Sequence, residues 1–391
     1  MSLSSSTYSM LRLTLLLLSL SSTFLMAQQD SLLVAATTAF DTQDYEQALD
    51  LYETIYSQDS TIQSLERAGL SASRLGMHPR ARQHFLNLEL RDSTSLIALT
   101  QLANLYEQEE NIPKAIKYHT RLSRLYPDRG YHFRKLGALY KSAGLRSDAV
   151  RYYDQALKLF PQDLAAIRGL SELYLLDRQF VNADSMLRAG LAQDSLNNRL
   201  HLLMARSQFL QKAYDSTAYY MEQIRGQYVL KPHHERMLGH AYVQVDSFER
   251  AVYHLMKALT NDGSKEYVHY NLFVAHEALE DTESAKYHLQ EAIKEGTSDD
   301  LDLYHRNLAR LYNEEDNLKE AIPHYQDAYK YGEDPLVLFY LARASDVYYK
   351  DKNVAVRYYA RFIKSGYDHP EYRDYSGKRM RYLKEHMHQG G

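Results

Sequence analysis

Histidine is the residue type in this chain whose positions come nearest to metal or proton chemistry. The candidates are His233, His234, His240, His386 and His388. A zinc-protease helix needs two histidines four positions apart, with a glutamate directly after the first. Glu235 does follow His234, but the next histidine stands six positions after His234, and no carboxylate spacing completes a ligand set. We therefore predict solvent-facing or groove-facing imidazoles, and no metal site.

Other arrangements that carry chemistry are missing from the sequence. The chain has no cysteine, which removes thiol catalysis, disulfides and cysteine-ligated zinc. Its glycines are few and scattered, so no loop cradles a phosphate, and no serine sits in a nucleophile elbow. Acidic residues are spread along the chain rather than paired for acid–base work. The prediction is a protein that is not an enzyme and that uses no cofactor.

Composition also limits the class of protein and the kind of partner. The chain has 391 residues, with 46 basic and 50 acidic ones, and a net charge of −4. Because this balance offers no basic surface for a polyanion, we predict no nucleic-acid partner. Proline and glycine are sparse at 8 and 16 residues, which favours helices.

An alanine recurs about every 34 residues, and it marks the repeating units that must position any functional residue. The marker positions are Ala48, Ala81, Ala115, Ala149, Ala183, Thr217, Ala251, Ala285, Ala321 and Ala355. Only Thr217 breaks the identity, and it is also small. Self-similarity at a fixed period of this length indicates a stacked repeat array. Such arrays usually present a surface for binding other molecules.

One unit, read around its marker Ala149, predicts two amphipathic helices. Apolar residues at spacings of three and four run from Phe133 to Tyr140, and they resume at Tyr153 after a break at residues 142–144. The break is so short that the two helices must form an antiparallel hairpin.

Other units repeat this pattern at fixed distances from the marker. A pair with a small second member stands thirteen and twelve residues before it: Ala68-Gly69, Leu102-Ala103, Leu136-Gly137, Met204-Ala205, Leu238-Gly239 and Leu308-Ala309. A tyrosine stands nine before it at Tyr106, Tyr140, Tyr174, Tyr242 and Tyr312. Pro79 and Pro113 suit the first turn of the second helix. Asp59-Ser60, Asp92-Ser93 and Asp194-Ser195 are expected to supply helix caps.

Together these features resemble the tetratricopeptide repeat (TPR) family, which shares the period and the pattern. The resemblance implies an all-α, right-handed superhelical solenoid of about ten antiparallel helix pairs with a C-terminal capping helix. It divides the chain into residues 28–366, the TPR solenoid, and residues 367–391, a capping helix and tail. One departure is the absence of the family's early tryptophan. Polar residues fill its position at His201, Glu235, His269 and His305.

Residues 1–27 have the layout of a secretory signal peptide. Arg12 precedes an apolar stretch, and the small residue Ala27 follows it, although Leu25 is imperfect for cleavage. An uncleaved membrane anchor is the alternative, but the apolar run is short of the ~20 residues that span a bilayer. We therefore expect an exported protein, periplasmic or associated with the cell envelope, with no integral membrane span after signal removal. No cysteine follows for a lipid anchor.

In the resembled family, the first helix of each unit lines a concave groove, and its groove-facing positions are free to vary because they do not carry the packing pattern. Here those positions hold Arg134, Lys135, Arg168, Arg206, Arg236, Met237, His240, Tyr270, Asn271, Arg306, Asn307 and Arg310. We therefore predict a protein–protein interaction scaffold that binds a partner peptide or domain in the groove, with an acidic segment as the ligand that these cations would suit. The alternative is that these cations are solvated or paired with neighbouring glutamates.

Two further possibilities remain open. A glycan or small-ligand binding module of the cell envelope would use tyrosines, of which the chain has 35. Self-association is possible through tyrosines near the carboxyl end: Tyr348, Tyr349, Tyr358 and Tyr359. Packing against the capping helix is the alternative role for that cluster.

Overall fold

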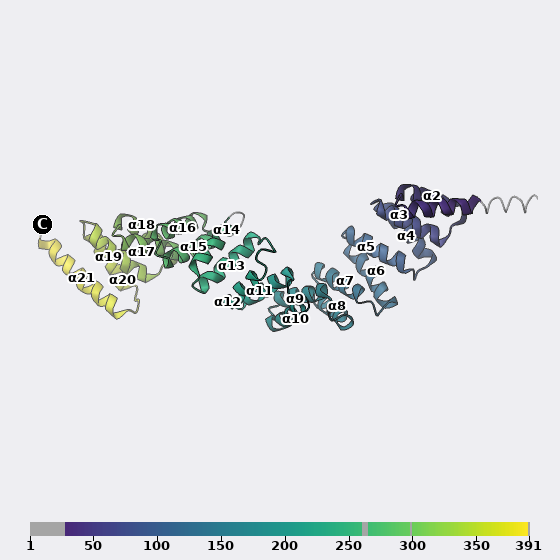
Figure 1. Ribbon diagram of the computed structural model, residues 1–391. Helices are drawn as coiled ribbons and strands as arrows, with labels where there is room; N and C mark the ends of the chain where they lie inside the picture. The colour runs from purple at the N-terminus through teal and green to yellow at the C-terminus, as the bar shows by residue number, and fades with distance from the viewer. Residues whose placement is uncertain (1–27, 260–264, 298, 390–391) are drawn as a thin grey trace, which may run out of the picture. The chain divides into compact units, whose positions relative to one another are not determined.

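The computed structural model describes residues 28–259, 265–297 and 299–389, with side chains up to 387, and every regular element among them is an α-helix (Figure 1). The expected signal segment, residues 1–27, lies outside the described residues. The chain divides into two compact units, Met1–Gln193 and Asp194–Gly391. In the part that is described, we find no helix with the length and apolar character needed to cross a membrane.

The first unit consists of five helix pairs. Its first helix covers residues 28–41 and packs against α2. The other helices are α2 (Tyr45–Asp59), α3 (Ile62–Arg74), α4 (His78–Arg91), α5 (Leu96–Gln108), α6 (Ile112–Leu125), α7 (Gly130–Ser142), α8 (Arg146–Leu159), α9 (Leu164–Leu176) and α10 (Phe180–Gln193).

The second unit continues with five more pairs and a final helix. Its helices are α11 (Asn198–Leu210), α12 (Tyr214–Glu222), α13 (Pro232–Gln244), α14 (Phe248–Ala258), α15 (Lys265–Ala278), α16 (Thr282–Glu295), α17 (Leu301–Glu314), α18 (Leu318–Gly332), α19 (Pro335–Tyr348), α20 (Asn353–Lys364) and α21 (Pro370–Gln389). The predicted all-α fold of about ten helix pairs with a C-terminal helix is confirmed.

The marker alanines form the seam of each pair. All ten marker positions, Thr217 included, are fully buried on the second helix of their pair. The small residue on the facing helix is required by the same close approach. A Cβ atom on Gly137 would lie 2.8 Å from the Tyr153 ring, and one on Gly69 would lie 2.8 Å from Phe85. The tight seam explains why both positions hold small residues.

The turn inside each pair has a recurring backbone feature. In nine of the ten pairs, the residue five positions before the marker has a positive φ: Gln43, Gly76, Glu110, Gly144, Arg178, Lys212, Asp246, Glu280 and Asp316. This left-handed conformation ends the first helix and redirects the chain into the second. Only two of the nine residues are glycine, so packing of the helices holds the others in a conformation that side chains disfavour.

The predicted caps were displaced by one to three residues. The cap of α3 is Thr61 and the cap of α5 is Ser95, whereas Ser60 ends α2 in the left-handed region. Asp92 binds the amide of Thr94 two residues ahead, which makes a turn between helices rather than a helix start. In the same way, the cap of α11 is Asn197 instead of the predicted pair at 194–195. Aspartate favours such local turns as readily as caps, and spacing alone does not separate the two.

The carboxyl end is closed by α21, which packs against α20. Leu383 on α21 is 4 % exposed and joins Tyr359 and Ala342 in one apolar cluster. Arg379 donates from Nε to Asp346 on α19 at 2.6 Å. Tyr359 is therefore a packing residue, which is the alternative role given above for the C-terminal tyrosines, while Tyr348 remains exposed.

Candidate functional site

The first helices of successive pairs line one side of each unit. Helix α13 contacts α15 directly in the second unit, and α7 contacts α9 in the first. All the predicted groove residues stand on first helices: α7, α9, α11, α13, α15 and α17. The structure thus places them along the side where neighbouring pairs come close together.

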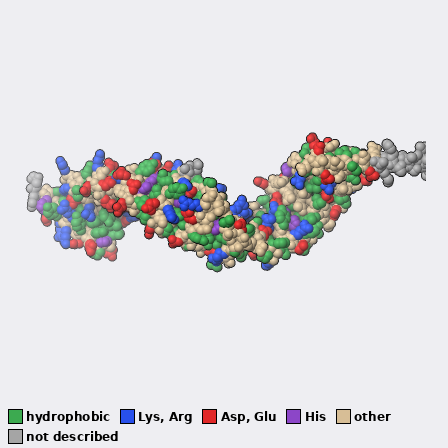
Figure 2. Space-filling model, viewed as in Figure 1, with side chains coloured by type: hydrophobic (Ala, Val, Ile, Leu, Met, Phe, Trp, Pro, Cys, Tyr) green, Lys and Arg blue, Asp and Glu red, His purple; other side chains and the backbone are tan. Residues whose placement is uncertain are grey.

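Most of the predicted groove cations are already paired with carboxylates. The ion pairs are Arg134 with Asp163 at 2.9 Å, Lys135 with Glu107 at 2.7 Å, Arg168 with Glu172 at 3.9 Å, Arg306 with Asp334 at 3.1 Å, and Arg310 with Glu314 at 3.0 Å and with Glu277. Figure 2 shows acidic and basic side chains intermixed on the face that it draws. These five cations are therefore paired with acidic residues of the chain itself, which is the alternative stated above to a role in ligand binding.

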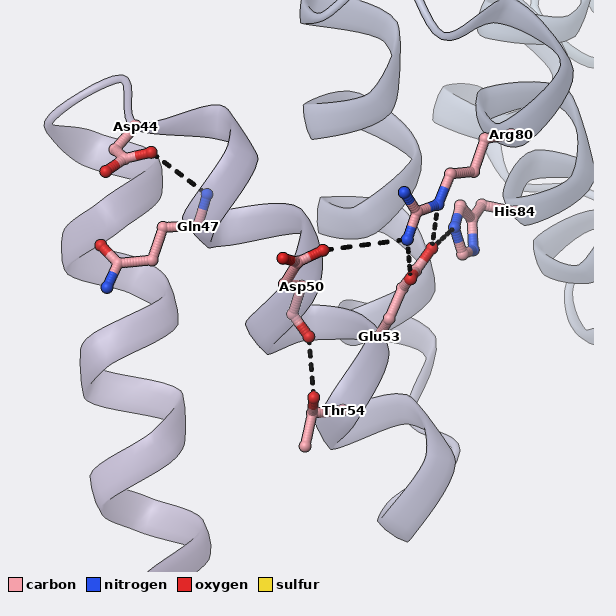
Figure 3. A network of polar contacts seen from close by, with 7 residues as sticks. All are labelled: Asp44, Gln47, Asp50, Glu53, Thr54, Arg80 and His84. Atoms are coloured by element: carbon pink, nitrogen blue, oxygen red, sulfur yellow. Dashed lines mark hydrogen bonds and ion pairs between the residues drawn. The ribbon is translucent and has the colours of Figure 1, made fainter.

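A network in the first unit shows how such pairing joins successive helix pairs (Figure 3). Arg80 and His84 on α4 both point toward Glu53 on α2, with 2.8 Å from Arg80 Nε and 2.7 Å from His84 Nε2 to the carboxylate. Burial acts to raise the pKa of Glu53, but the hydrogen bonds from Arg80 and His84 outweigh it and lower that pKa. Charged side chains here hold neighbouring pairs together, a role that leaves them little capacity for a ligand.

A different environment surrounds Arg206 and Arg236 in the second unit. They border a cavity of about 560 Å³ between α11, α13 and α15. Its other lining residues are Leu202, Leu203, Phe209, Leu210, His233, His234, Met237 and Tyr267. We call this cavity the groove pocket. Arg206 is exposed and forms no ion pair with any residue that the structure describes. A concave apolar site with a few polar groups is the usual form of a ligand pocket.

Burial favours the neutral form of two histidines at the groove pocket, His234 and His240. Burial, with His233 and Lys231 nearby, lowers the pKa of His234 to about 4. Burial also lowers the pKa of His240, whose Nδ1 lies 2.7 Å from Asn271 Oδ1 and 2.7 Å from the Tyr267 hydroxyl. Arg206 and Arg236 are the two permanently charged cations among the residues that line the pocket.

The remaining predicted site residues have structural surroundings. Asn271 is 4 % exposed and anchors His240, so it positions the rim of the groove pocket rather than lining it. Tyr270 packs on Tyr304 with ring centroids 5.1 Å apart. Asn307 is half-buried on α17 and is not among the residues that line the groove pocket. Of the twelve predicted residues, the pocket brings together Arg206, Arg236 and Met237, with His240 at its edge.

Sequence reasoning missed a second set of buried polar residues. Three of the four polar residues at the early aromatic position pair with the second helix: Glu235 with His254 at 2.6 Å, His269 with His288 at 2.9 Å, and His305 with His324 at 2.9 Å. The fourth, His201, instead lies 2.9 Å from the carbonyl oxygen of Ser195. Each pair is 19 residues apart in the sequence, which is the signal that would have found it. We call these contacts the buried histidine pairs.

The arrangement of possible metal-ligating side chains bears on the histidine candidates. Within the described ranges, no group of three or more histidine, aspartate or glutamate side chains is arranged to hold a metal ion. His386 Nδ1 bonds to the Tyr382 carbonyl oxygen at 2.9 Å, and the side chain of His388 lies outside the described residues.

Comparison with known proteins identifies the type of repeat. A sequence profile of the tetratricopeptide repeat matches residues 98–130, which cover α5 and α6 of the third pair. The same register recurs through the ten pairs described above. The chain therefore contains tetratricopeptide repeats. A comparison with curated proteins found no match.

Several solved structures are similar at low sequence identity. A tetratricopeptide repeat protein from Parabacteroides merdae is 16 % identical, with a TM-score of 0.45, over 63 % of this chain and 98 % of that one. The C-terminal part of a TPR protein from Cytophaga hutchinsonii is 15 % identical, with a TM-score of 0.48, over 59 % and 94 %. YrrB, a TPR protein with an unusual peptide-binding site, is 17 % identical, with a TM-score of 0.42, over 45 % and 91 %.

Proposed function

We propose that this protein is an interaction scaffold whose groove pocket binds an extended peptide segment carrying a carboxylate. The observation that carries the proposal is the exposed Arg206 beside an apolar cavity of about 560 Å³. The five cations that the sequence also suggested are engaged with acids of the chain itself. The site therefore narrows from a long arginine-lined face to one pocket on α11, α13 and α15.

The chemistry of binding follows from the lining. The planar guanidinium group of Arg206 can bind a carboxylate through two parallel hydrogen bonds. Leu203, Phe209 and Met237 would cover an apolar side chain next to that carboxylate, and the flexible thioether of Met237 can adapt to its shape. The two arginines supply positive charge for the carboxylate, and the apolar lining covers the neighbouring side chain. Recognition needs both the carboxylate and the apolar side chain.

The test is a charge reversal confined to the pocket. The variant Arg206→Glu/Arg236→Glu should abolish capture of the partner, measured by crosslinking in the native cell envelope and mass spectrometry of the captured peptides. The matched control is Arg168→Glu, also on a first helix and also predicted as a groove residue, but paired with Glu172. Capture that survives the double variant, or that is lost equally in the control, contradicts the proposal.

We also propose that the protein is exported. The support is the basic residue, apolar stretch and small residue within positions 1–27. Fractionation of cells and N-terminal sequencing of the mature protein test this proposal. A protein that retains Met1 and remains in the cytoplasm would refute it.

A further inference from the structure

A row of exposed tyrosines runs along the second helices of three consecutive pairs in the second unit. Tyr219 on α12, Tyr253 on α14 and Tyr287 on α16 each stand two residues after the marker of their pair. Their exposed fractions are 59 %, 50 % and 54 %, although large apolar rings are usually covered. We call this set the tyrosine row. It shares no residue with the groove pocket.

Each ring of the tyrosine row is held in the same way. The next residue in the chain carries a ring that meets it edge-on: Tyr220 at 5.1 Å and 79°, His254 at 5.0 Å and 87°, and His288 at 5.0 Å and 67°. His254 and His288 are buried members of the buried histidine pairs. An exposed ring braced by a fixed neighbour loses little conformational entropy when it binds a ligand. This edge-on contact thus occurs at all three rings, and at Tyr253 the Nζ atom of Lys257 also lies over one face of the ring, 4.3 Å from its centroid.

A cleft of about 450 Å³ opens beside the middle ring. It lies between α12, α13 and α14 and is lined by Tyr253, Met221, Leu230 and Leu238 together with charged side chains. The charges balance, because Glu222 pairs with Arg225 at 3.2 Å and Glu235 with His254 at 2.6 Å and Lys257 at 3.9 Å. The cleft therefore offers donors and acceptors of hydrogen bonds without attracting a charged ligand.

The cleft exists because the sixth pair is irregular. Helix α12 has 9 residues, while the second helices of the other pairs have 11 to 15. The chain then runs without a helix from 223 to 231, through Gly226 with φ of 81°, before α13 begins. The short α12 and the non-helical segment that follows it thus leave a concave site, which a second helix of ordinary length would fill.

We propose that the tyrosine row and its cleft bind an extended, uncharged glycan strand. A sugar ring has an apolar face of C–H groups that stacks on an aromatic ring, and hydroxyl groups at its edge that need polar partners. A polymer of such rings repeats both features, as the tyrosine row does. Charged side chains, Glu222, Arg225 and Lys257 among them, interrupt the apolar lining of the cleft, which disfavours docking of a folded protein. The balanced charge disfavours a polyanion.

The experiment measures binding to neutral polysaccharides by the full mature chain. Affinity electrophoresis in gels that contain glycogen, xyloglucan or galactomannan gives dissociation constants, and a glycan microarray extends the panel. Each single change, Tyr219→Ala, Tyr253→Ala or Tyr287→Ala, should weaken binding about fivefold, and the triple variant about 100-fold. Circular dichroism checks that the variants are folded.

Two controls separate this site from the groove pocket. Tyr348→Ala removes an exposed tyrosine, 46 % exposed on α19, outside the tyrosine row and should leave glycan binding unchanged. The variant Arg206→Glu/Arg236→Glu should likewise bind glycan as the native chain does. The proposal is overturned if the native chain binds no neutral glycan, or if the triple variant retains full affinity. It is also overturned if the tyrosine row proves necessary only for binding peptides.

Discussion

The buried histidine pairs predict that acid loosens the second unit. His269 and His288 join α15 to α16 through one hydrogen bond between their Nδ1 atoms, 2.9 Å apart. One nitrogen must accept, so the pair cannot carry two Nδ1 protons, and burial opposes even one charge. Burial, with His269 and His276 nearby, lowers the pKa of His288 to about 4, and burial lowers the pKa of His269 as well.

The size of the effect follows from the difference between folded and unfolded chains. An unfolded histidine has a pKa of about 6.5, so below that pH the unfolded chain binds protons that folded His288 does not. The stability that the neutral pair supports is complete above pH 6.5 and is lost as the pH falls toward 4. For a folded pKa of about 4, the loss at pH 5 is about 2 kcal/mol from His288 alone.

Hydrogen exchange followed by mass spectrometry is the suitable assay, because repeat arrays open locally rather than in one transition. Between pH 7.5 and 5, after correction for intrinsic exchange, the opening free energy of α16 should fall by about 2 kcal/mol. The variant His269→Phe/His288→Met should remove most of this fall. Both residues occur at equivalent positions, as Phe133 and Met186. The control His386→Gln should behave as the native chain. Equal protection at both pH values, or an undiminished fall in the double variant, would refute the reasoning.

Two other predictions concern stability. Enlarging Ala156, fully buried at the seam of the fourth pair, to leucine should cost about 1–3 kcal/mol through overpacking, seen as a lower opening free energy of α7 and α8 by the same exchange method. A stability unchanged by that substitution would show that the seam is looser than described. Glu53→Gln should cost about 1 kcal/mol by weakening the bonds from Arg80 and His84, and unchanged exchange in α2 and α4 would show that the network adds nothing.

Most of the fold could be predicted because its determinants repeat. One small residue per unit must fit the seam between two helices, and ten occurrences fix the register even where a single unit departs from it. Helix ends were predicted less well. Pro79 and Pro113 mark helix starts because a missing N–H costs nothing there, and the structure places both in first turns. Asp92 was misplaced because its side chain serves a turn equally well.

The candidate site could be predicted only in part. The register correctly identified the first helices, but it did not show which cations are engaged. Arg134 and Asp163, or Arg310 and Glu277, lie about one repeat apart in sequence and meet only when neighbouring pairs stack. Exposed and engaged arginines look alike along the chain. The groove pocket depends in addition on how Phe209 and Tyr267 pack, which the spacing of apolar residues does not determine.

The left-handed turn residues are suitable sites for spectroscopic labels that measure distances within the array. They recur in nine of the ten pairs and are exposed, and their side chains vary from Gln43 to Arg178 to Asp316, so the fold tolerates chemical change there. The chain contains no cysteine, so a thiol introduced at any of these turns would be unique and could carry a dye or a spin label. Two labels placed on different turns of one unit would then report, in ångströms, how far that unit bends when a ligand enters.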